Sequence, residues 1–231
     1  MSSLIWLIPA LFNPIFESLR GVVSKKASKN SSIVTISLFN NLIPLLFFTP
    51  LLFFIELKWN WEFVWSTLVA GGLNAIAIYL FHKAVSLEDI SLVAPLTSFS
   101  PLFLLVTSPL IIGEYPAQKG VAGIVLIFIG SYLLNAGKGT EGILAPIVSL
   151  VKRKGARSML LVALIWSVSA NFDKKAILAS SIWQYAFFIN LVITLCVAGY
   201  MFATKSFRMS EIRLEWKNLI TIGLIVTGAN F

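Results

Sequence analysis

The chain has 231 residues, of which 58% are hydrophobic and 12% charged, and its mean hydropathy is +0.88. A soluble domain averages about 45–50% apolar and about 25% charged residues, so this composition excludes a soluble enzyme and a disordered chain. It predicts an all-α integral membrane protein. The formal net charge of +8 indicates contact with lipid headgroups rather than with nucleic acid, because the basic residues lie between apolar runs.

The sequence offers little metal or redox chemistry. Its single cysteine, Cys196, cannot form a disulfide within the chain, and its single histidine, His82, leaves no His-rich metal site. We therefore expect no metal ion, no cofactor and no catalytic residue. We expect Cys196 to act as a small apolar residue and His82 to lie at a membrane interface.

Apolar runs of about 20 residues, the length that crosses a hydrocarbon core of ~30 Å, recur along the chain. They predict transmembrane helices over residues 4–23, 33–55, 63–83, 90–112, 119–137, 158–178 and 182–203. A further apolar run predicts another helix that begins near residue 218 and reaches the end of the sequence. Short polar turns separate these runs, except for one longer connection over residues 138–157.

The two halves of the chain resemble each other. Residues 25–42 align without a gap on residues 174–191, and nine of the eighteen pairs are identical. The identities include Lys-Lys-Ala, Ser-Ser and the mid-helix pair Asn41 and Asn190, which a shared apolar composition would not align. The alignment resumes, two residues out of step, at Trp65 and Trp216. These matches indicate a duplication.

The duplication predicts the domain organisation. A first unit of five helices would occupy residues 1–137, a basic connecting loop residues 138–157, and a second unit residues 158–231. Because five is an odd number, the second unit would enter the membrane from the opposite face, which gives an inverted repeat as in secondary transporters. About eight of ten helices would be present, and the complete product would carry roughly 55–65 further residues.

The most specific pattern lies in residues 84–134. It consists of Ala84, Ser91-Leu92-Val93-Ala94-Pro95-Leu96, Ser100-Pro101-Leu102-Phe103, Gly113-Glu114, Gly120, Gly123, Gly130 and Leu133-Leu134. This pattern resembles the EamA-like repeat of the drug/metabolite transporter superfamily, in which a fourth helix ends in Gly-Glu and a fifth is rich in glycine. The start of the second unit, from Leu164 to Ala176, also resembles the beginning of that repeat.

This resemblance implies a ten-helix carrier that moves small molecules by alternating access. It does not identify the substrate, because the superfamily handles amino acids, sugars, nucleotide sugars, lipids and drugs. We expect a multi-pass protein of a bacterial or archaeal plasma membrane, with membrane lipids and a small-molecule substrate as partners and with a homodimer as a possible assembly. The two units differ at Glu17, because the residue that aligns with it in the second unit is Trp166. A role for Glu17 is therefore not inherited from the repeat.

An ionisable side chain inside a span costs roughly 2.5–3.5 kcal/mol, so each one needs a reason. Asn13, Glu17 and Arg20 share one face of the first predicted helix, beside Pro14. On one interpretation, Glu17 offers a carboxylate to a proton or a cationic substrate. On the other, Glu17 and Arg20 form a structural pair near the membrane surface.

Three asparagines are further candidates for the substrate pathway. Asn41 and Asn190 occupy equivalent positions and either face a central cavity or join neighbouring helices, a contribution that averages only ~0.6 kcal/mol. Asn74 follows Gly71-Gly72, where packing between helices is the favoured interpretation.

The predicted helix over residues 90–112 is rich in proline. Pro95 and Pro101 are candidates for a helix break, and Thr97 and Ser98 between them are candidates for the pathway. Such a break survives where it lines a cavity or is covered by protein, so a bent, cavity-lining helix and a packed kink are the alternatives. Glu114, at the end of this helix, is a candidate boundary or gate residue. Asp173, before Lys174-Lys175, is expected to form an interfacial salt bridge.

The basic residues favour one orientation. Fourteen of the 18 lysines and arginines fall on the side of the odd-numbered loops, which the positive-inside rule places in the cytoplasm with the N-terminus outside. The family resemblance more often suggests a cytoplasmic N-terminus. We follow the charge distribution.

Three functions compete. The first is a secondary carrier of a small polar or amphipathic metabolite. The second is a membrane-embedded enzyme, which usually needs clustered acids or a His/Asp set near one interface, whereas the ten acidic residues here are scattered. The third is a lipid flippase-type or accessory subunit. The sequence favours the carrier and predicts that the protein is not an enzyme.

Overall fold

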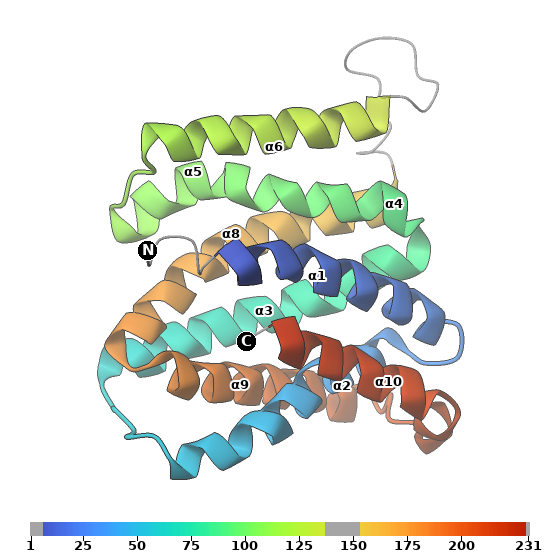
Figure 1. Cartoon of the computed structure of the whole chain (residues 1–231). Coiled ribbons are helices and arrows are strands. Elements are labelled where there is room, and N and C mark those ends of the chain that lie inside the picture. The colour runs from blue at the N-terminus through green and yellow to red at the C-terminus, as the bar shows by residue number, and fades with distance from the viewer. Residues whose placement is uncertain (1–6, 137–152, 230–231) are drawn as a thin grey trace.

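The computed structural model describes residues 7–136 and 153–229, and the regular elements in these ranges are all helices (Figure 1). This confirms the all-α prediction. The α-helices and the two 3₁₀-helices, labelled η, are α1 (Leu7–Ala27), α2 (Ile33–Phe48), η1 (Thr49–Phe53), α3 (Trp61–Leu87), α4 (Ile90–Val93), η2 (Ala94–Ser98), α5 (Phe99–Ile112), α6 (Gln118–Ala136), α8 (Lys154–Ala179), α9 (Ile182–Ala203) and α10 (Met209–Ala229).

Five helical stretches are long and apolar enough to cross a membrane. They are Ile33–Phe53, Trp61–Leu87, Ile90–Ile112, Lys154–Ala179 and Ile182–Ala203. The helices α1, α6 and α10 are not among them, and α1 and α10 carry ionisable residues along their length. The larger number of spans that the sequence predicts stays a prediction, and the predicted loop over residues 138–157 lies mostly outside the described residues.

The helix α10 begins at Met209, not near residue 218. The acidic residues that interrupt the apolar pattern before residue 218 lie on this helix and bind the α1–α2 connection. Glu211 accepts a hydrogen bond from the backbone N–H of Ser32 (2.8 Å), and Glu215 accepts one from the Asn30 amide (2.6 Å). These partners are distant in sequence, so the local pattern did not reveal that the segment is helical.

Two helices begin in the same way at equivalent positions of the predicted repeat. Ser32 caps α2, its hydroxyl oxygen accepting a hydrogen bond from the backbone N–H of Thr35 (3.3 Å). Ser181 caps α9 by accepting one from the backbone N–H of Gln184 (3.2 Å). A serine at this position satisfies a backbone donor that the first turn of a helix leaves unpaired. The duplicated Ser-Ser sequence thus fixes where both helices start.

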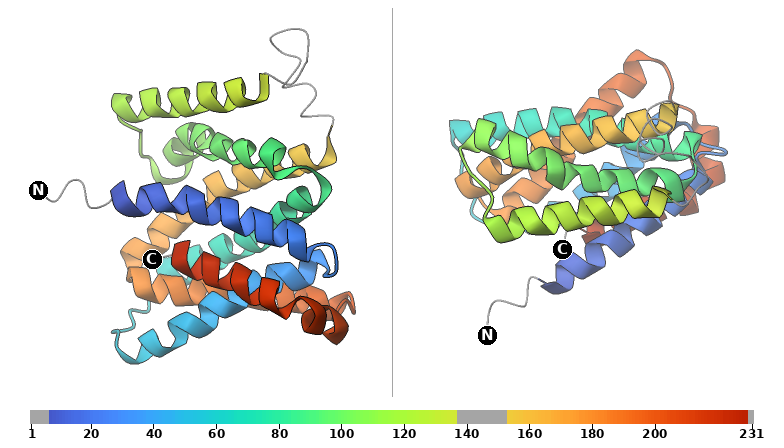
Figure 2. Two further views of the ribbon diagram at one scale, coloured as in Figure 1. Left: turned by 45° about the vertical axis from the view of Figure 1, so that its right-hand side comes forward. Right: turned by 90° about the horizontal axis from the view of Figure 1, so that it is seen from above.

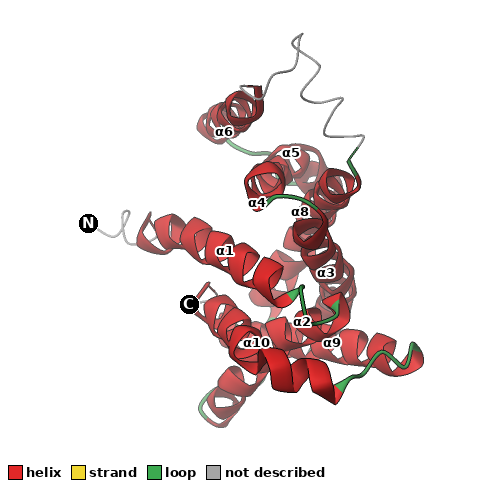
Figure 3. Ribbon diagram, turned by 90° about the vertical axis from the view of Figure 1, so that its right-hand side faces the viewer, coloured by secondary structure: helices red, strands yellow, loops and turns green. Residues whose placement is uncertain are grey.

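The helices pack in a pattern that a two-fold relation between α1–α3 and α8–α10 would produce. In that relation α1 corresponds to α8, α2 to α9 and α3 to α10. The contact of α3 with α8 then matches that of α10 with α1, and the contact of α3 with α9 matches that of α10 with α2. The equivalent helices α2 and α9 pack on each other. α5 packs on α8, and α6 packs on α5 at the outside of the bundle (Figures 2 and 3). The largest buried apolar cluster joins α3, α4, η2 and α8. The inverted repeat stays a prediction, which this packing supports.

The connections lie at two ends of the bundle. The α1–α2, α3–α4 and α9–α10 connections and the start of α8 lie at one end, on the right in Figure 1. We call this end the basic face, because many lysines and arginines lie in or next to these connections. They are Lys25, Lys26, Lys29, Lys83, Arg153, Lys154, Lys205 and Arg208. The α5–α6 and α8–α9 connections lie at the other end, the opposite face.

Two glycines allow close approach between helices. A Cβ atom on Gly71 of α3 would lie 2.4 Å from Cγ1 of Val192 on α9, and one on Gly223 of α10 would lie 2.4 Å from Cβ of Ile43 on α2. Ile43 and Val192 directly follow the last aligned pair of the internal repeat. At Gly72, by contrast, no atom lies within 4 Å of the position that a Cβ would take.

We predict that Gly223→Ala lowers the melting temperature of the purified protein. The added methyl group would also lie 2.8 Å from the carbonyl oxygen of Phe39, so α10 must move away from α2, and overpacking of this kind costs about 1–3 kcal/mol. Gly72→Ala is the matched control, because it adds the same group to a helix at an open position. Equal melting temperatures for the two variants would contradict the close contact.

Candidate functional site

A cavity of about 610 Å³ lies between α1, the last turns of α3 and the α4–η2 segment, and we call it the α1–α3–η2 cavity. It brings together four residues that the sequence singled out, namely Asn13, Glu17, Pro95 and Thr97. The remaining lining residues are Pro14, Ser18, Gly21, Phe81, Val85, Ile90, Ser91 and Ala94. The lining therefore combines one carboxylate, one amide and several hydroxyls with apolar side chains.

The broken helix beside this cavity follows from its sequence. Pro95 lacks a backbone N–H, and the chain there forms η2 instead of a continuous α-helix. The Thr97 hydroxyl donates to the carbonyl oxygen of Ala94 (2.8 Å), and the Ser98 hydroxyl donates to that of Pro95 (2.5 Å). Both predicted alternatives are thus present together, because the segment lines a cavity and its hydroxyls bond back to the chain.

The second break candidate, Pro101, is the third residue of α5. The first backbone N–H groups of a helix have no partner within that helix, so a proline costs little there. Pro101 therefore lies where the α-helix resumes after η2, not at a separate break.

Glu17 and Arg20 form an ion pair at the edge of the cavity. Nη2 of Arg20 donates to Oε2 of Glu17, and the Arg20 side chain is 7% exposed whereas that of Glu17 is 36% exposed. The Arg20 guanidinium lies 4.2 Å from the ring centroid of Phe81 and 5.7 Å from that of Trp166. A desolvated cation over an aromatic ring gains ~2 kcal/mol or more. Arg20 thus joins α1 to α3 and α8 and holds Glu17 between a buried cation and the cavity.

Asn41 and Asn190 lie outside the lining of this cavity. Both are buried, and each amide donates to a carbonyl four residues earlier in its own helix, Asn41 to Ser37 (3.3 Å) and Asn190 to Ala186 (2.7 Å). Their matching contacts agree with their equivalent positions in the internal alignment. Their role in a pathway stays a prediction.

Asn74 belongs to a chain of polar side chains within the bundle. Its amide donates to the Ser169 hydroxyl on α8 (2.6 Å), and Ser169 donates to Oδ1 of Asp173 (3.1 Å). The Tyr185 hydroxyl on α9 donates to the same carboxylate oxygen. Asp173 thus bonds with neutral hydroxyls and forms no ion pair among the described residues, so the expected interfacial salt bridge is wrong. Lys174 pairs with Glu114 instead.

Glu114 lies at the opposite face, where it pairs with Lys174 and links the end of α5 to α8. Both partners are solvent-exposed. This position is that of a boundary residue, away from the α1–α3–η2 cavity. A gating role for Glu114 stays a prediction.

His82 is 1% exposed and therefore packs inside the protein, while its predicted level near a membrane interface stays a prediction. The helix α3 continues to Leu87 and does not end at residue 83, which places His82 inside the helix and against its neighbours. Neither of its ring nitrogens has a hydrogen-bond partner among the described residues.

Sequence reasoning missed the aromatic partners of Arg20 and the Asp173–Tyr185 contact. Packing between helices sets all of these contacts. One signal was present in the sequence, since Trp166 is the residue that the internal alignment places opposite Glu17.

The described helices and their apolar spans define a multi-pass integral membrane protein whose cavity lies beside a broken helix. The model of the EamA-like transporter family matches residues 4–136, which is more than half of the chain, and the chain belongs to this family. The predicted resemblance is thereby confirmed, and a membrane transporter-type function follows. The matched range contains every residue that lines the cavity. No curated protein matches the chain.

We predict that Tyr185→Phe lowers the melting temperature of the purified protein. The change removes one donor from the Asp173 carboxylate and leaves that group with Ser169 alone, and hydrogen bonds between membrane helices contribute about 0.6 kcal/mol on average and up to about 1.7 kcal/mol. Tyr200→Phe is the control, because Tyr200 lies on the same helix and is half exposed. A melting curve of Tyr185→Phe that coincides with the control would show that the contact contributes nothing.

Proposed function

We propose that the protein is a secondary carrier that moves a small metabolite across the membrane by alternating access, and that the α1–α3–η2 cavity is part of its pathway. Membership of the EamA-like transporter family supports transport, and the cavity supports a solute-sized ligand. The observation that carries the proposal is a half-exposed carboxylate, Glu17, beside a broken helix in a cavity of about 610 Å³. An ionisable group in such a place is a functional group by default.

The lining suggests the chemistry of the solute. Glu17 can accept a hydrogen bond or pair with a cation, while Ser18, Ser91 and Thr97 offer hydroxyls and Phe81 offers an apolar surface. Arg20 already neutralises much of the charge of Glu17. The cavity therefore suits a polar or amphipathic solute, such as an amino acid or a drug-like amine, better than a highly charged anion.

The proposed architecture is an inverted repeat, with α1–α3 related to α8–α10. The equivalent caps of α2 and α9 and the paired helix contacts support it. We also propose that the basic face is cytoplasmic in a plasma membrane, because lysines and arginines concentrate in its connections.

We expect Glu17→Gln to abolish driven uptake of the solute while leaving the protein level and membrane insertion intact. The substitution keeps the shape and the hydrogen-bonding capacity of the side chain and removes its titratable charge. Uptake is measured in proteoliposomes with an imposed ion gradient, after a screen of metabolites has found a transported solute. Fully coupled uptake by a stable Glu17→Gln variant would end the role of Glu17 in transport.

A structural role for Glu17 predicts a different result. Glu17→Gln would then leave the buried guanidinium of Arg20 without its anion, so thermal stability would fall, and the double variant Glu17→Gln/Arg20→Gln would restore it.

The same proteoliposomes separate the rival functions. Solute counterflow supports the carrier, whereas turnover of a lipid headgroup substrate supports a membrane enzyme and translocation of labelled lipid supports a flippase.

A further inference from the structure

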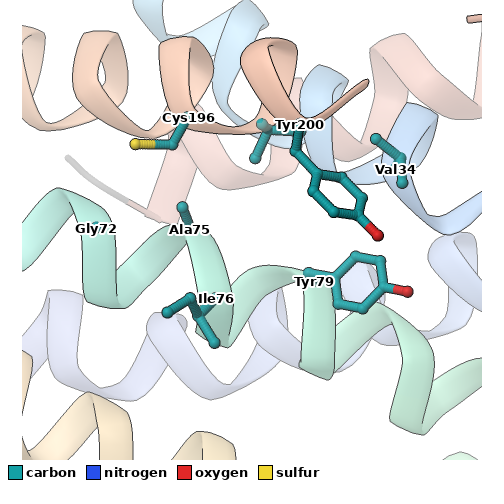
Figure 4. A pocket seen from close by; sticks show the side chains of 8 residues that line it. Val34, Gly72, Ala75, Ile76, Tyr79, Cys196 and Tyr200 are labelled. Atoms are coloured by element: carbon teal, nitrogen blue, oxygen red, sulfur yellow. The ribbon is translucent and has the colours of Figure 1, made fainter. Parts of the chain in front are cut away.

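A second cavity, of about 360 Å³, lies on a different side of α3 and shares no lining residue with the α1–α3–η2 cavity. It opens between α3 and α9, next to the start of α2 (Figure 4). Its lining is largely apolar and consists of Val34, Gly72, Ala75, Ile76, Tyr79, Cys196, Val197 and Tyr200. The proposed transport function leaves this cavity without a role.

The helix packing explains why the cavity is open. Val192 of α9 occupies the space above Gly71, whereas no atom lies within 4 Å of the Cβ position of the neighbouring Gly72. Ile76 and Tyr200 are 54% and 52% exposed, so the cavity opens sideways at the surface of the bundle. For a helix that crosses a membrane, this surface faces lipid.

Two tyrosines close the end of the cavity that lies toward the basic face. The rings of Tyr79 and Tyr200 meet edge to face with their centroids 6.0 Å apart. Figure 4 shows both hydroxyls on the side of Val34, at the start of α2, and Cys196 and Gly72 farther away. Along α3, Gly72 and Tyr79 are separated by about 10 Å at ~1.5 Å per residue. The cavity therefore runs from the middle of the span toward the headgroup level, where tyrosine is favoured.

Two lysines lie beyond the tyrosines, toward the basic face. Lys83 lies one helical turn beyond Tyr79, and Lys205 follows Tyr200 in the α9–α10 connection. Neither ammonium group forms an ion pair with the residues that the structure describes.

The acidic groups that the structure describes at the basic face are already engaged elsewhere. Glu88 pairs with Arg153 (3.4 Å), and Asp89 pairs with Lys25 (3.2 Å). Glu211 accepts hydrogen bonds from the α1–α2 connection. Lys83 and Lys205 are thus available to an anion that arrives from the membrane surface.

We infer that this cavity binds one acyl chain of an anionic phospholipid from the leaflet at the basic face. The chain lies against Gly72, Ala75 and Ile76, the tyrosine hydroxyls lie at the level of the ester groups, and the phosphate meets Lys83 and Lys205. An apolar cavity that opens to hydrocarbon offers water too few hydrogen-bond partners, whereas an acyl chain fills it without loss. The site is independent of the transport pathway, so it stands or falls separately from the proposed function.

The test counts retained lipid. The protein is purified in detergent, mixed with equal amounts of phosphatidylglycerol and phosphatidylcholine, and analysed by native mass spectrometry. We expect one phosphatidylglycerol to remain bound in preference to phosphatidylcholine. Gly72→Phe fills the cavity and should lose this lipid. Gly199→Phe is the matched control, because Gly199 is an equally open glycine on α9 that does not line the cavity, and it should retain the lipid.

A second pair of variants leaves the cavity itself unchanged. Lys83→Gln and Lys205→Gln should each weaken the retention of phosphatidylglycerol by roughly five-fold and leave that of phosphatidylcholine unchanged, as expected for a lysine near anionic lipid. The two lysine variants therefore test the inference even if Gly72→Phe fails to fold.

The chain's only thiol supplies an independent readout. Cys196 lines the cavity, so added phosphatidylglycerol should slow its reaction with a membrane-permeant maleimide, and it should not do so in Gly72→Phe. Equal retention of the two lipids, equal loss in the two glycine variants, or a dimer of this chain that buries Cys196 without lipid would each overturn the inference.

Discussion

Hydrocarbon offers no hydrogen-bond partner to a backbone amide or carbonyl, and the arrangement of this bundle depends on that constraint. The described spans are helical, so nearly all their backbone groups are paired within the helix. The break at η2 persists because the Thr97 and Ser98 hydroxyls bind the carbonyls of Ala94 and Pro95. The backbone there needs no water. The segment can therefore line a cavity without exposing unpaired polar groups to lipid.

Hydropathy predicted the helices because the same constraint acts on sequence. The predicted helix over residues 182–203 has the observed bounds, and the one over 90–112 has the observed ends together with its break near Pro95. The errors lie where polar residues belong to helices. α3 runs past Lys83 to Leu87, and α10 begins before Glu211, whose carboxylate accepts a hydrogen bond from the distant Ser32. A pattern that reads only neighbouring residues assigns such turns to loops.

The candidate site was predictable to the extent that it is local. Helix periodicity placed Asn13 and Glu17 on one face of α1, and the prolines marked the broken helix that meets them. The environment of Arg20 was not predictable, because Phe81 and Trp166 are ordinary apolar residues until tertiary packing brings them to the guanidinium. The environment of Asp173 was misjudged for the same reason. Its adjacent lysines suggested a salt bridge, while its actual partner Tyr185 lies on the next helix.

The Arg20 site has a consequence for the proposed transport cycle. A carboxylate that binds a cationic group must be able to leave its resting partner, and a buried partner left alone would ordinarily cost several kcal/mol. Arg20 does not depend on Glu17 alone, because its guanidinium also lies over Phe81 and beside Trp166. In the proposed cycle, these aromatic contacts would remain while Glu17 turned toward a solute in the cavity. On this proposal, the rings of Phe81 and Trp166 would lower the free-energy cost of separating Glu17 from Arg20. They would also keep the guanidinium in place, so that the ion pair could re-form after the solute departs.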